Sequence, residues 1–266
     1  MAITASDVNK LRQQTGAGMM DCKNALVEAN GDFEAAIDIL RKKGQKIAAK
    51  RGGNDAKEGV ILAQATADGT AGVILTLNCE TDFVAKNDGY VSLVQSLVDI
   101  ALTNLPESVE ALKALPYDSR LSVDEKITEQ IGVIGEKLDL SGYAVVRAAN
   151  VVAYNHPGNQ LATLVGLTIA GEEVAEAGRQ VAMQVAAMAP IAINKDGVDE
   201  RTIEREIEIG KELAIQEGKP ADMAEKIALG RLNKFFQENT LLSQAFVRDN
   251  KMTVEQFLNS TASGLT

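Results

Sequence analysis

The sequence predicts an α+β protein whose core is a degenerate duplication. Apolar, strand-like runs at residues 60–65 and 71–77 flank the turn sequence Asp68-Gly69-Thr70, and a helical pattern follows at residues 90–102. The same order returns as strands at residues 143–154 and 161–167 and a helix at residues 175–189. Because tight turns join antiparallel strands, we predict two antiparallel sheets that each carry helices on one face.

Helices are predicted before and between the two copies. Capping and helix-breaking residues divide the start of the chain into three short helices, at residues 8–13, 20–29 and 33–42. Asp32 is placed to cap the third helix and Gly44 to end it. Between the copies, helices are predicted at residues 106–115 and 122–138, with Ile134 and Leu138 on one face of the second.

A pair of charged helices is predicted near the C-terminus. Residues 198–217 are dense in charge, Gly218-Lys219-Pro220 interrupts them, and apolar residues from Met223 to Phe235 mark a returning helix. The narrow apolar seams suit either a projecting coiled-coil arm or a hairpin packed on the core, and the pattern leaves both open. The end of the chain is predicted as an extended stretch at residues 241–247 and a short helix at residues 253–258.

Composition excludes several classes of function. With 27 basic against 37 acidic residues the net charge is −10, which argues against direct binding of nucleic acid. Cys22 and Cys79 form no CxxC pair, and a single histidine excludes a histidine pair, so neither a metal site nor a cofactor is predicted. No phosphate-binding loop or nucleophile elbow indicates an enzyme. No run approaches the roughly 20 apolar residues of a membrane span, so we expect a cytoplasmic protein without membrane contact.

The stretch from Leu77 to Asp88 is the strongest candidate for a binding site. It joins a buried strand to a helix, and such junctions expose side chains on a rigid frame. Asp82 and Phe83 would form the exposed pair. In the alternative, the Asp82 carboxylate caps a helical turn and Phe83 folds into the core, and spacing alone leaves both open.

Two other features allow two interpretations each. Met19 and Met20 either form an adaptable apolar contact surface or complete the small core of the N-terminal helices. The basic residues from Lys42 to Arg51 lead into Gly52-Gly53, and we interpret them as the solvated face of a flexible linker rather than a phosphate-binding surface.

His156 lies at the second predicted turn with no nucleophile near it in sequence, which is poor support for a catalytic base.

Two motifs carry a resemblance to a known family. Residues 15–23, Thr-Gly-Ala-Gly-Met-Met-Asp-Cys-Lys, and residues 78–86, Asn-Cys-Glu-Thr-Asp-Phe-Val-Ala-Lys, closely resemble bacterial elongation factor Ts. The likeness extends over essentially the whole chain. It implies a guanine nucleotide exchange factor that binds elongation factor Tu in its GDP-bound and nucleotide-free states, and it leaves open a dimer of heterodimers. The rival interpretation is an adaptor of the ubiquitin-associated type, because residues 25–37 also resemble the second half of that domain.

The resemblance implies a five-part organisation. The parts are a ubiquitin-associated-like three-helix domain (1–54), a core N-subdomain (55–140), a core C-subdomain (141–197), a coiled-coil helical hairpin inserted in the core (198–237) and a C-terminal module (238–266).

The resemblance also implies roles for individual residues. In the family the Thr-Asp-Phe-Val segment enters the partner and displaces Mg²⁺, a role that falls on Thr81, Asp82, Phe83 and Val84. Contacts with the partner fall on Met19, Met20, Lys23, Ile134, Gly135, His156, Phe246 and Val247.

Four features depart from the family pattern. Glu80 stands where glutamine is frequent, Asn24 where a second lysine is common, and Ala245 where proline is usual. Family members generally continue past the position of Thr266 into one more short strand, so we expect the pairing of this end to differ.

Overall fold

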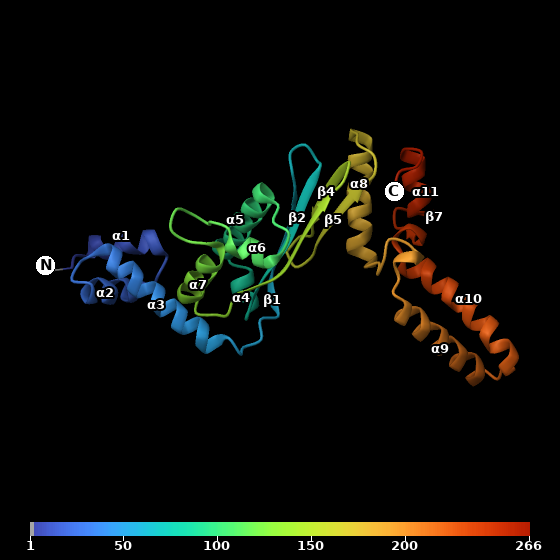
Figure 1. Cartoon of the computed structure of the whole chain (residues 1–266), viewed down its shortest axis with the longest axis horizontal. Coiled ribbons are helices and arrows are strands. Elements are labelled where there is room, and N and C mark those ends of the chain that lie inside the picture. The colour runs from blue at the N-terminus through green and yellow to red at the C-terminus, as the bar shows by residue number, and fades with distance from the viewer. Residues whose placement is uncertain (1–2) are drawn as a thin grey trace. The chain divides into compact units, whose positions relative to one another are not determined.

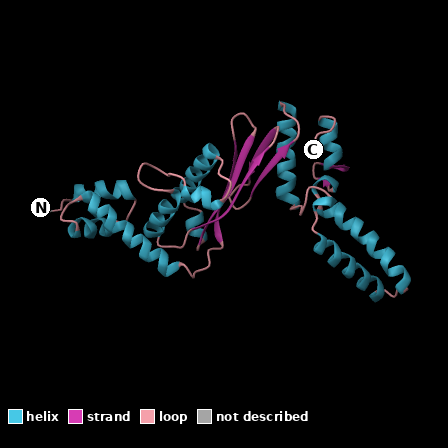
Figure 2. Cartoon of the chain, in the orientation of Figure 1, coloured by secondary structure: helices cyan, strands magenta, loops and turns pink. Residues whose placement is uncertain are grey.

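The computed structural model describes residues 3–266, with the side chains of all of these except Ala221 and Asp222. The chain divides into two compact units. Unit 1 holds the residues up to Gln64 together with Gly72–Val145 and Asn155–Ala162, and unit 2 holds Ala65–Ala71, Val146–Tyr154 and Thr163–Thr266. Both units mix helices with small sheets, as Figure 2 shows, so the predicted α+β class is confirmed.

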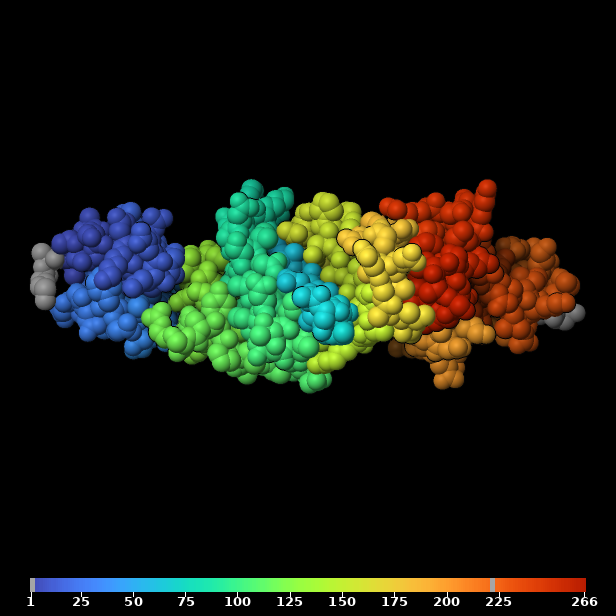
Figure 3. All heavy atoms as spheres, turned by 90° about the horizontal axis from the view of Figure 1, so that it is seen from above, coloured from blue at the N-terminus to red at the C-terminus, as the bar shows by residue number. Residues whose placement is uncertain are grey.

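Unit 1 begins with three helices, α1 (Ala5–Thr15), α2 (Met19–Glu28) and α3 (Phe33–Arg51). Local hydrogen bonds set their ends. The Thr4 hydroxyl accepts from the backbone N–H of Asp7 while the Asp7 carboxylate accepts from that of Thr4. Asp32 caps α3 as predicted, accepting from Ala35 N at 3.0 Å. In the space-filling view these helices are coloured blue (Figure 3). Their shared core contains Leu11, Cys22, Ala25, Leu26, Ala36 and Ile37.

The prediction that Gly44 ends the third helix is wrong. α3 runs on to Arg51, so the basic residues interpreted as linker are helical. Gly44 is buried against Gly132 of α7 (Val123–Ile134), and a Cβ added at Gly132 would lie 2.7 Å from the Gly44 Cα. Two glycines therefore let these helices cross at close range, which the sequence signal for a helix stop cannot reveal.

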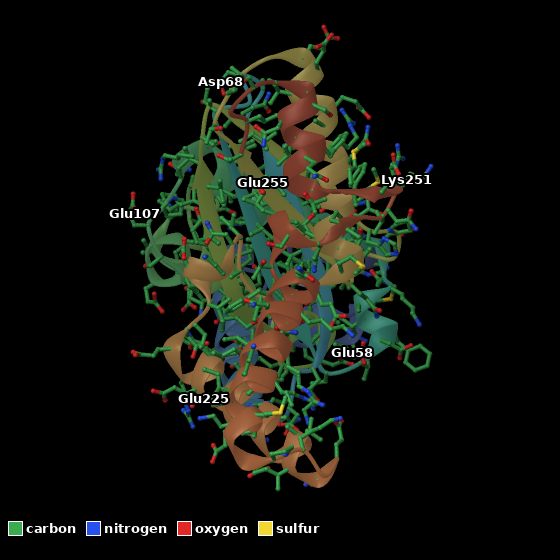
Figure 4. All side chains as sticks on the ribbon, turned by 90° about the vertical axis from the view of Figure 1, so that its right-hand side faces the viewer. Glu58, Asp68, Glu107, Glu225, Lys251 and Glu255 are labelled. Atoms are coloured by element: carbon green, nitrogen blue, oxygen red, sulfur yellow. The ribbon has the colours of Figure 1, made fainter. Side chains whose placement is uncertain are left out.

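The first five strands form two sheets. β1 (Glu58–Ala65), β2 (Ala71–Cys79) and β3 (Asp139–Arg147) are neighbours in that order, and β4 (Asn150–Asn155) pairs with β5 (Ala162–Leu167). The turn between β1 and β2 is held by Asp68, whose carboxylate accepts from Thr66 Oγ1 at 2.6 Å and from Thr70 N at 3.0 Å. Figure 4 labels Asp68, the residue that holds this turn.

The single strand predicted at residues 143–154 is also wrong, because the chain breaks between β3 and β4. At the break, Ala148 N donates to Thr70 O and Val151 N donates to Gly69 O. The carbonyl groups of the first turn thus accept hydrogen bonds from the backbone N–H groups at the point where the chain passes from one sheet to the other. The order of strand, turn, strand and helix is present in both halves, as β1-β2-α5 and β4-β5-α8.

Three further helices complete unit 1 around α7: α4 (Asp82–Ala85), α5 (Asp88–Asn104) and α6 (Val109–Ala114). α7 ends at Gly135, whose φ of 82° is left-handed, so the predicted continuation to Leu138 is wrong. Leu138 is nevertheless buried, from the connection that precedes β3. The core of this unit includes Val73, Leu75, Leu77, Val94, Leu97, Val98, Ile127 and Ile131.

Unit 2 contains α8 (Glu172–Met188), α9 (Glu200–Gln216) and α10 (Ala221–Asn239), followed by β6 (Ala245–Phe246), β7 (Asp249–Thr253) and α11 (Val254–Thr261). Short 3-10 turns, η1 (Lys195–Gly197) and η2 (Leu241–Ser243), flank the pair α9 and α10. Figure 1 shows α9 and α10 side by side, extending away from α8 and α11. Gly210 lies against Ala228 at their crossing. Among residues 3–266, no helix has the length and apolar character needed to span a membrane.

Candidate functional site

A one-turn helix follows directly on a buried strand at the candidate site. β2 ends at Cys79, and Thr81 caps α4 by accepting from Val84 N at 3.4 Å. Thr81 has an extended backbone, with φ −125° and ψ 151°, as N-cap residues do. The predicted strand-to-helix junction is therefore confirmed, and its capping residue is Thr81 rather than Asp82.

Asp82 and Phe83 both face solvent. The Phe83 side chain is 83% exposed, so the alternative in which it folds into the core is wrong. The Asp82 carboxylate is about half exposed and accepts from Lys86 Nζ at 2.7 Å, one helical turn away. This hydrogen bond and its charge lower the pKa of Asp82 and raise the pKa of Lys86. Asp82 is therefore an anion at neutral pH.

The next two residues anchor the exposed pair. Val84 packs against the core of unit 1 and Ala85 is buried. Burial on one side of such a short helix leaves the other side, with Phe83, pointing outward.

A groove of about 360 Å³ lies beside the Phe83 side chain. Phe83 and Val84 form one wall, and Val133 and Ile134 at the end of α7 form another. Its remaining lining residues are Asn87, Gly89, Tyr90 and Gln130. Gly135 follows directly, in open space. The structure thus brings Ile134 together with the Thr-Asp-Phe-Val segment, although they are about 50 residues apart in sequence.

Two carboxylates that sequence reasoning missed lie beneath the loop. Glu136 accepts from Glu80 N and Thr81 N, both at 3.1 Å, and from Thr81 Oγ1 at 2.7 Å. The only sequence signal for this role is that Glu136 directly follows Ile134 and Gly135. A carboxylate has no local preference that would point to a loop 55 residues away.

Glu80 is the second of these carboxylates. It accepts from Arg51 Nη1 at 2.8 Å, from Asn54 Nδ2 at 2.9 Å and from the backbone N–H of Lys137. The N–H of Lys137 is the main cause of a lowered pKa for the Glu80 carboxyl, with Asn54 and Arg51 adding to it. The end of α3, the loop and the segment before β3 are joined at this carboxylate.

The methionines of α2 are exposed. Met19 and Met20 are 54% and 63% exposed, and Lys23 faces solvent on the next turn. The helix buries Cys22, Ala25 and Leu26 instead, so the interpretation that the methionines complete the core is wrong. The turn that starts α2 lies close to the groove, because a Cβ on Gly16 would be 3.8 Å from Val133 Cγ1.

The other candidate residues lie elsewhere in the fold. His156 is exposed in the turn between β4 and β5, where its N–H donates to Leu161 O at 2.8 Å. In unit 2, Phe246 is only 3% exposed and stacks on Phe257 with ring centroids 4.2 Å apart. Val247 beside it is 50% exposed. Of this last pair, Val247 is thus the residue that another molecule can reach.

Comparisons with known proteins cover the whole chain. The family profile described as Elongation factor TS matches residues 80–266. A protein named Elongation factor Ts from Amoebophilus asiaticus is 56% identical over 266 residues, which cover all of this chain and 96% of the relative. Proteins of the same name from Christiangramia forsetii and Cytophaga hutchinsonii are 51% and 50% identical, each over 99% of this chain and 95% of the relative.

The chain belongs to the elongation factor Ts family. The elongation factor Ts profile begins at Glu80, so it includes the Thr-Asp-Phe-Val segment and the groove residues of α7. The three N-terminal helices lie outside the matched range but inside the full-length likeness to the relatives.

Proposed function

We propose that the chain is the guanine nucleotide exchange factor for elongation factor Tu and that Asp82 and Phe83 open the nucleotide site of elongation factor Tu. A role in nucleotide exchange during translation elongation follows from membership of the family. The observation that carries the finer proposal is the exposure of Phe83 at 83% on a loop that is hydrogen-bonded on its inner side.

In the proposed mechanism, the factor disturbs the Mg²⁺ ion that holds the nucleotide in the partner. Mg²⁺ requires near-octahedral oxygen ligands and takes few of them from protein, so a small displacement of the surrounding loops weakens its hold on the nucleotide phosphates. Phe83 would act as an apolar wedge between packed elements of the partner. Asp82 would form polar contacts that stabilise the displaced arrangement, with Thr81 and Val84 fixing the two residues in place.

Several separate surfaces would supply the affinity that such a displacement needs. We assign contacts with the partner to Met19, Met20 and Lys23 on α2, to Ile134 and Gly135 at the groove, and to His156 and Val247. Phe246, which is buried beside Val247, would hold that residue in place. Binding of GDP and of the factor are coupled reciprocally, so every tenfold loss of GDP affinity costs the factor the same tenfold, about 1.4 kcal/mol.

The five-part organisation belongs to the same proposal. We assign the α1–α3 bundle to a ubiquitin-associated-like domain, α9 and α10 to a coiled-coil arm, and residues 238–266 to a C-terminal module. The close approach of Gly210 and Ala228 supports a narrow helical seam in the arm. The partner would bind in GDP-bound and nucleotide-free states, and a dimer of such complexes remains open.

Stopped-flow release of fluorescent GDP from elongation factor Tu tests the wedge. Phe83→Ala should lower the release rate at saturating factor about tenfold while changing the half-saturating concentration less, because the side chain acts in the displaced state. Phe83→Leu, which retains apolar bulk, should give an intermediate rate. Leu229→Ala removes another exposed apolar side chain, 48% exposed on α10, and should leave the rate unchanged.

A rate that is unaltered by Phe83→Ala would overturn the wedge. If the wild-type chain binds elongation factor Tu but never speeds loss of GDP, the protein is an adaptor.

A further inference from the structure

We propose that Glu136 is a positioning residue for nucleotide exchange, whose carboxylate fixes the orientation of the helical turn that presents Phe83. This inference deepens the proposed function and rests on it. It concerns a residue that touches no partner in the proposal and acts through Glu80 and Thr81.

The first step in the argument is that α4 cannot hold its own orientation. It spans four residues, Asp82–Ala85, and a single helical turn in water is unstable because the ordering of its backbone outweighs its few hydrogen bonds. Its direction therefore depends on the burial of Val84 and Ala85 on one side and on the groups that hold its first residues. Those groups are the Thr81 cap and the carboxylate behind that cap.

The second step is the geometry of that carboxylate. Its two oxygens take three donors from two consecutive residues, Glu80 N, Thr81 N and Thr81 Oγ1, at 2.7–3.1 Å. The same Thr81 hydroxyl accepts from Val84 N, so a continuous chain of hydrogen bonds links Glu136 to the first turn of α4. Bonds in such a chain polarise one another, and a charged acceptor strengthens them.

The third step is that Glu136 also belongs to the opposite wall of the groove. It follows Ile134 and Gly135, and Ile134 faces Phe83 across about 360 Å³ of open space. One side chain thereby links the two walls of the groove.

The carboxylate is itself well anchored. Lys137, the next residue, donates from its side chain to Gly52 O and Asn54 O, both at 3.0 Å, and its N–H binds Glu80. The segment that carries Glu136 is therefore tied both to the residues at the end of α3 and to the loop itself. This is the arrangement expected of a group that positions another residue.

The test compares two substitutions of Glu136 in the full chain, with elongation factor Tu carrying fluorescent GDP as the probe. Glu136→Ala removes both acceptor oxygens, and with them three hydrogen bonds, and should lower the release rate at saturating factor about tenfold, with a smaller change in the half-saturating concentration. Glu136→Gln should restore most of the rate, because its carbonyl can accept both N–H groups while its amide donates to Thr81 Oγ1.

Glu125→Ala is the matched control. Glu125 lies in α7. Its carboxylate accepts from the backbone N–H of Ser122 and from the Arg41 guanidinium, and it does not touch the loop. Its loss should leave the exchange rate near that of the wild type. Amide hydrogen exchange gives an independent readout, since Glu136→Ala should speed exchange at Glu80 and Thr81 selectively.

Each outcome decides between the two proposals. An unchanged rate for Glu136→Ala beside a reduced rate for Phe83→Ala overturns the positioning role and leaves the proposed function intact. Equal losses in Glu136→Ala and Glu125→Ala also overturn it, because general destabilisation would then explain both. No effect of Phe83→Ala overturns the wedge and the positioning role together. Should Glu136→Ala fail to fold, Thr81→Val removes the hydroxyl alone, and a normal rate in that variant overturns the inference.

Discussion

The dipeptide Phe-Val occurs at two candidate sites in this chain and has opposite orientations in them. At α4, Phe83 is 83% exposed and Val84 packs on the core. At β6, Phe246 is 3% exposed against Phe257 and Val247 is 50% exposed. In the first site the phenylalanine is exposed and the valine is packed against the core. In the second site the phenylalanine is buried and the valine is exposed. What differs is their backbone, a capped helical turn in the first and, in the second, the end of β6 with the turn that follows it.

The groups that hold the two dipeptides differ in charge. The carboxylates of Glu136 and Glu80 hold the loop before Phe83. A neutral pair holds the second site, where buried Gln184 accepts from Val247 N at 2.9 Å and donates to Gln244 Oε1 at 3.2 Å. Exposed loops tolerate ionised supports because water remains near, whereas full burial favours neutral amides.

The largest expected effect is on stability, and it separates the two phenylalanines. Phe246→Ala should destabilise the protein by about 3–5 kcal/mol, because it leaves a cavity against Phe257 and the core of unit 2. Phe83→Ala should change stability by less than about 0.5 kcal/mol, since its side chain is already in water. Urea unfolding of the two variants measures the difference, and similar midpoints would show that the contrast in burial is false.

A second, smaller effect is expected at the neutral support. Gln184→Leu should cost about 1–3 kcal/mol, because Val247 N and Gln244 Oε1 lose their partner inside the protein. The double variant Gln184→Leu and Gln244→Leu should cost less than the sum of the two single losses, because the hydrogen bond between the two glutamines is lost only once. Denaturant unfolding of the single and double variants gives the coupling, and strictly additive losses would argue against the pair.

The smallest effect is a pH dependence confined to the charged support. The pKa of Glu80 is lowered in the folded chain, so its contribution to stability is present above the ordinary glutamate pKa of about 4.3 and is lost as pH falls through the lower folded value. The stability difference between wild type and Glu80→Gln should be about 0.5 kcal/mol near neutral pH and decrease as the pH falls below the ordinary glutamate pKa.

The same pH series sharpens the comparison between the two supports. The cost of Gln184→Leu should stay constant, because neither glutamine titrates. Unfolding midpoints measured between pH 3 and 7 check both expectations. A cost of Gln184→Leu that follows the same pH curve as Glu80→Gln would remove the distinction between charged and neutral supports.

Much of the helical structure could be predicted from short-range signals. Asp32 caps α3 and Gly16 ends α1 because these preferences depend on hydrogen bonds within about four residues. Gly44 shows the limit of such signals, since the same residue type that ends one helix lets another pass close to α7. The break between β3 and β4 is similar, because its hydrogen bonds go to a turn about 80 residues earlier.

The candidate site was predicted in part. Motif residues placed Asp82 and Phe83 at a strand-to-helix junction, and both are exposed there. Glu136 and Glu80 were missed as supports because their partners lie 26–57 residues away along the chain. Phe246 carried the same kind of motif signal as Phe83 and proved to be buried.

By itself the sequence determined the family, the α+β class, the helix caps and the position of the Thr-Asp-Phe-Val segment, because each depends on neighbouring residues or on likeness to known chains. Only the tertiary structure decided which phenylalanine faces water, which sheet each strand joins and which carboxylates hold the loop. These outcomes depend on packing between residues far apart in sequence. A side chain is exposed or buried according to what the rest of the fold brings against it.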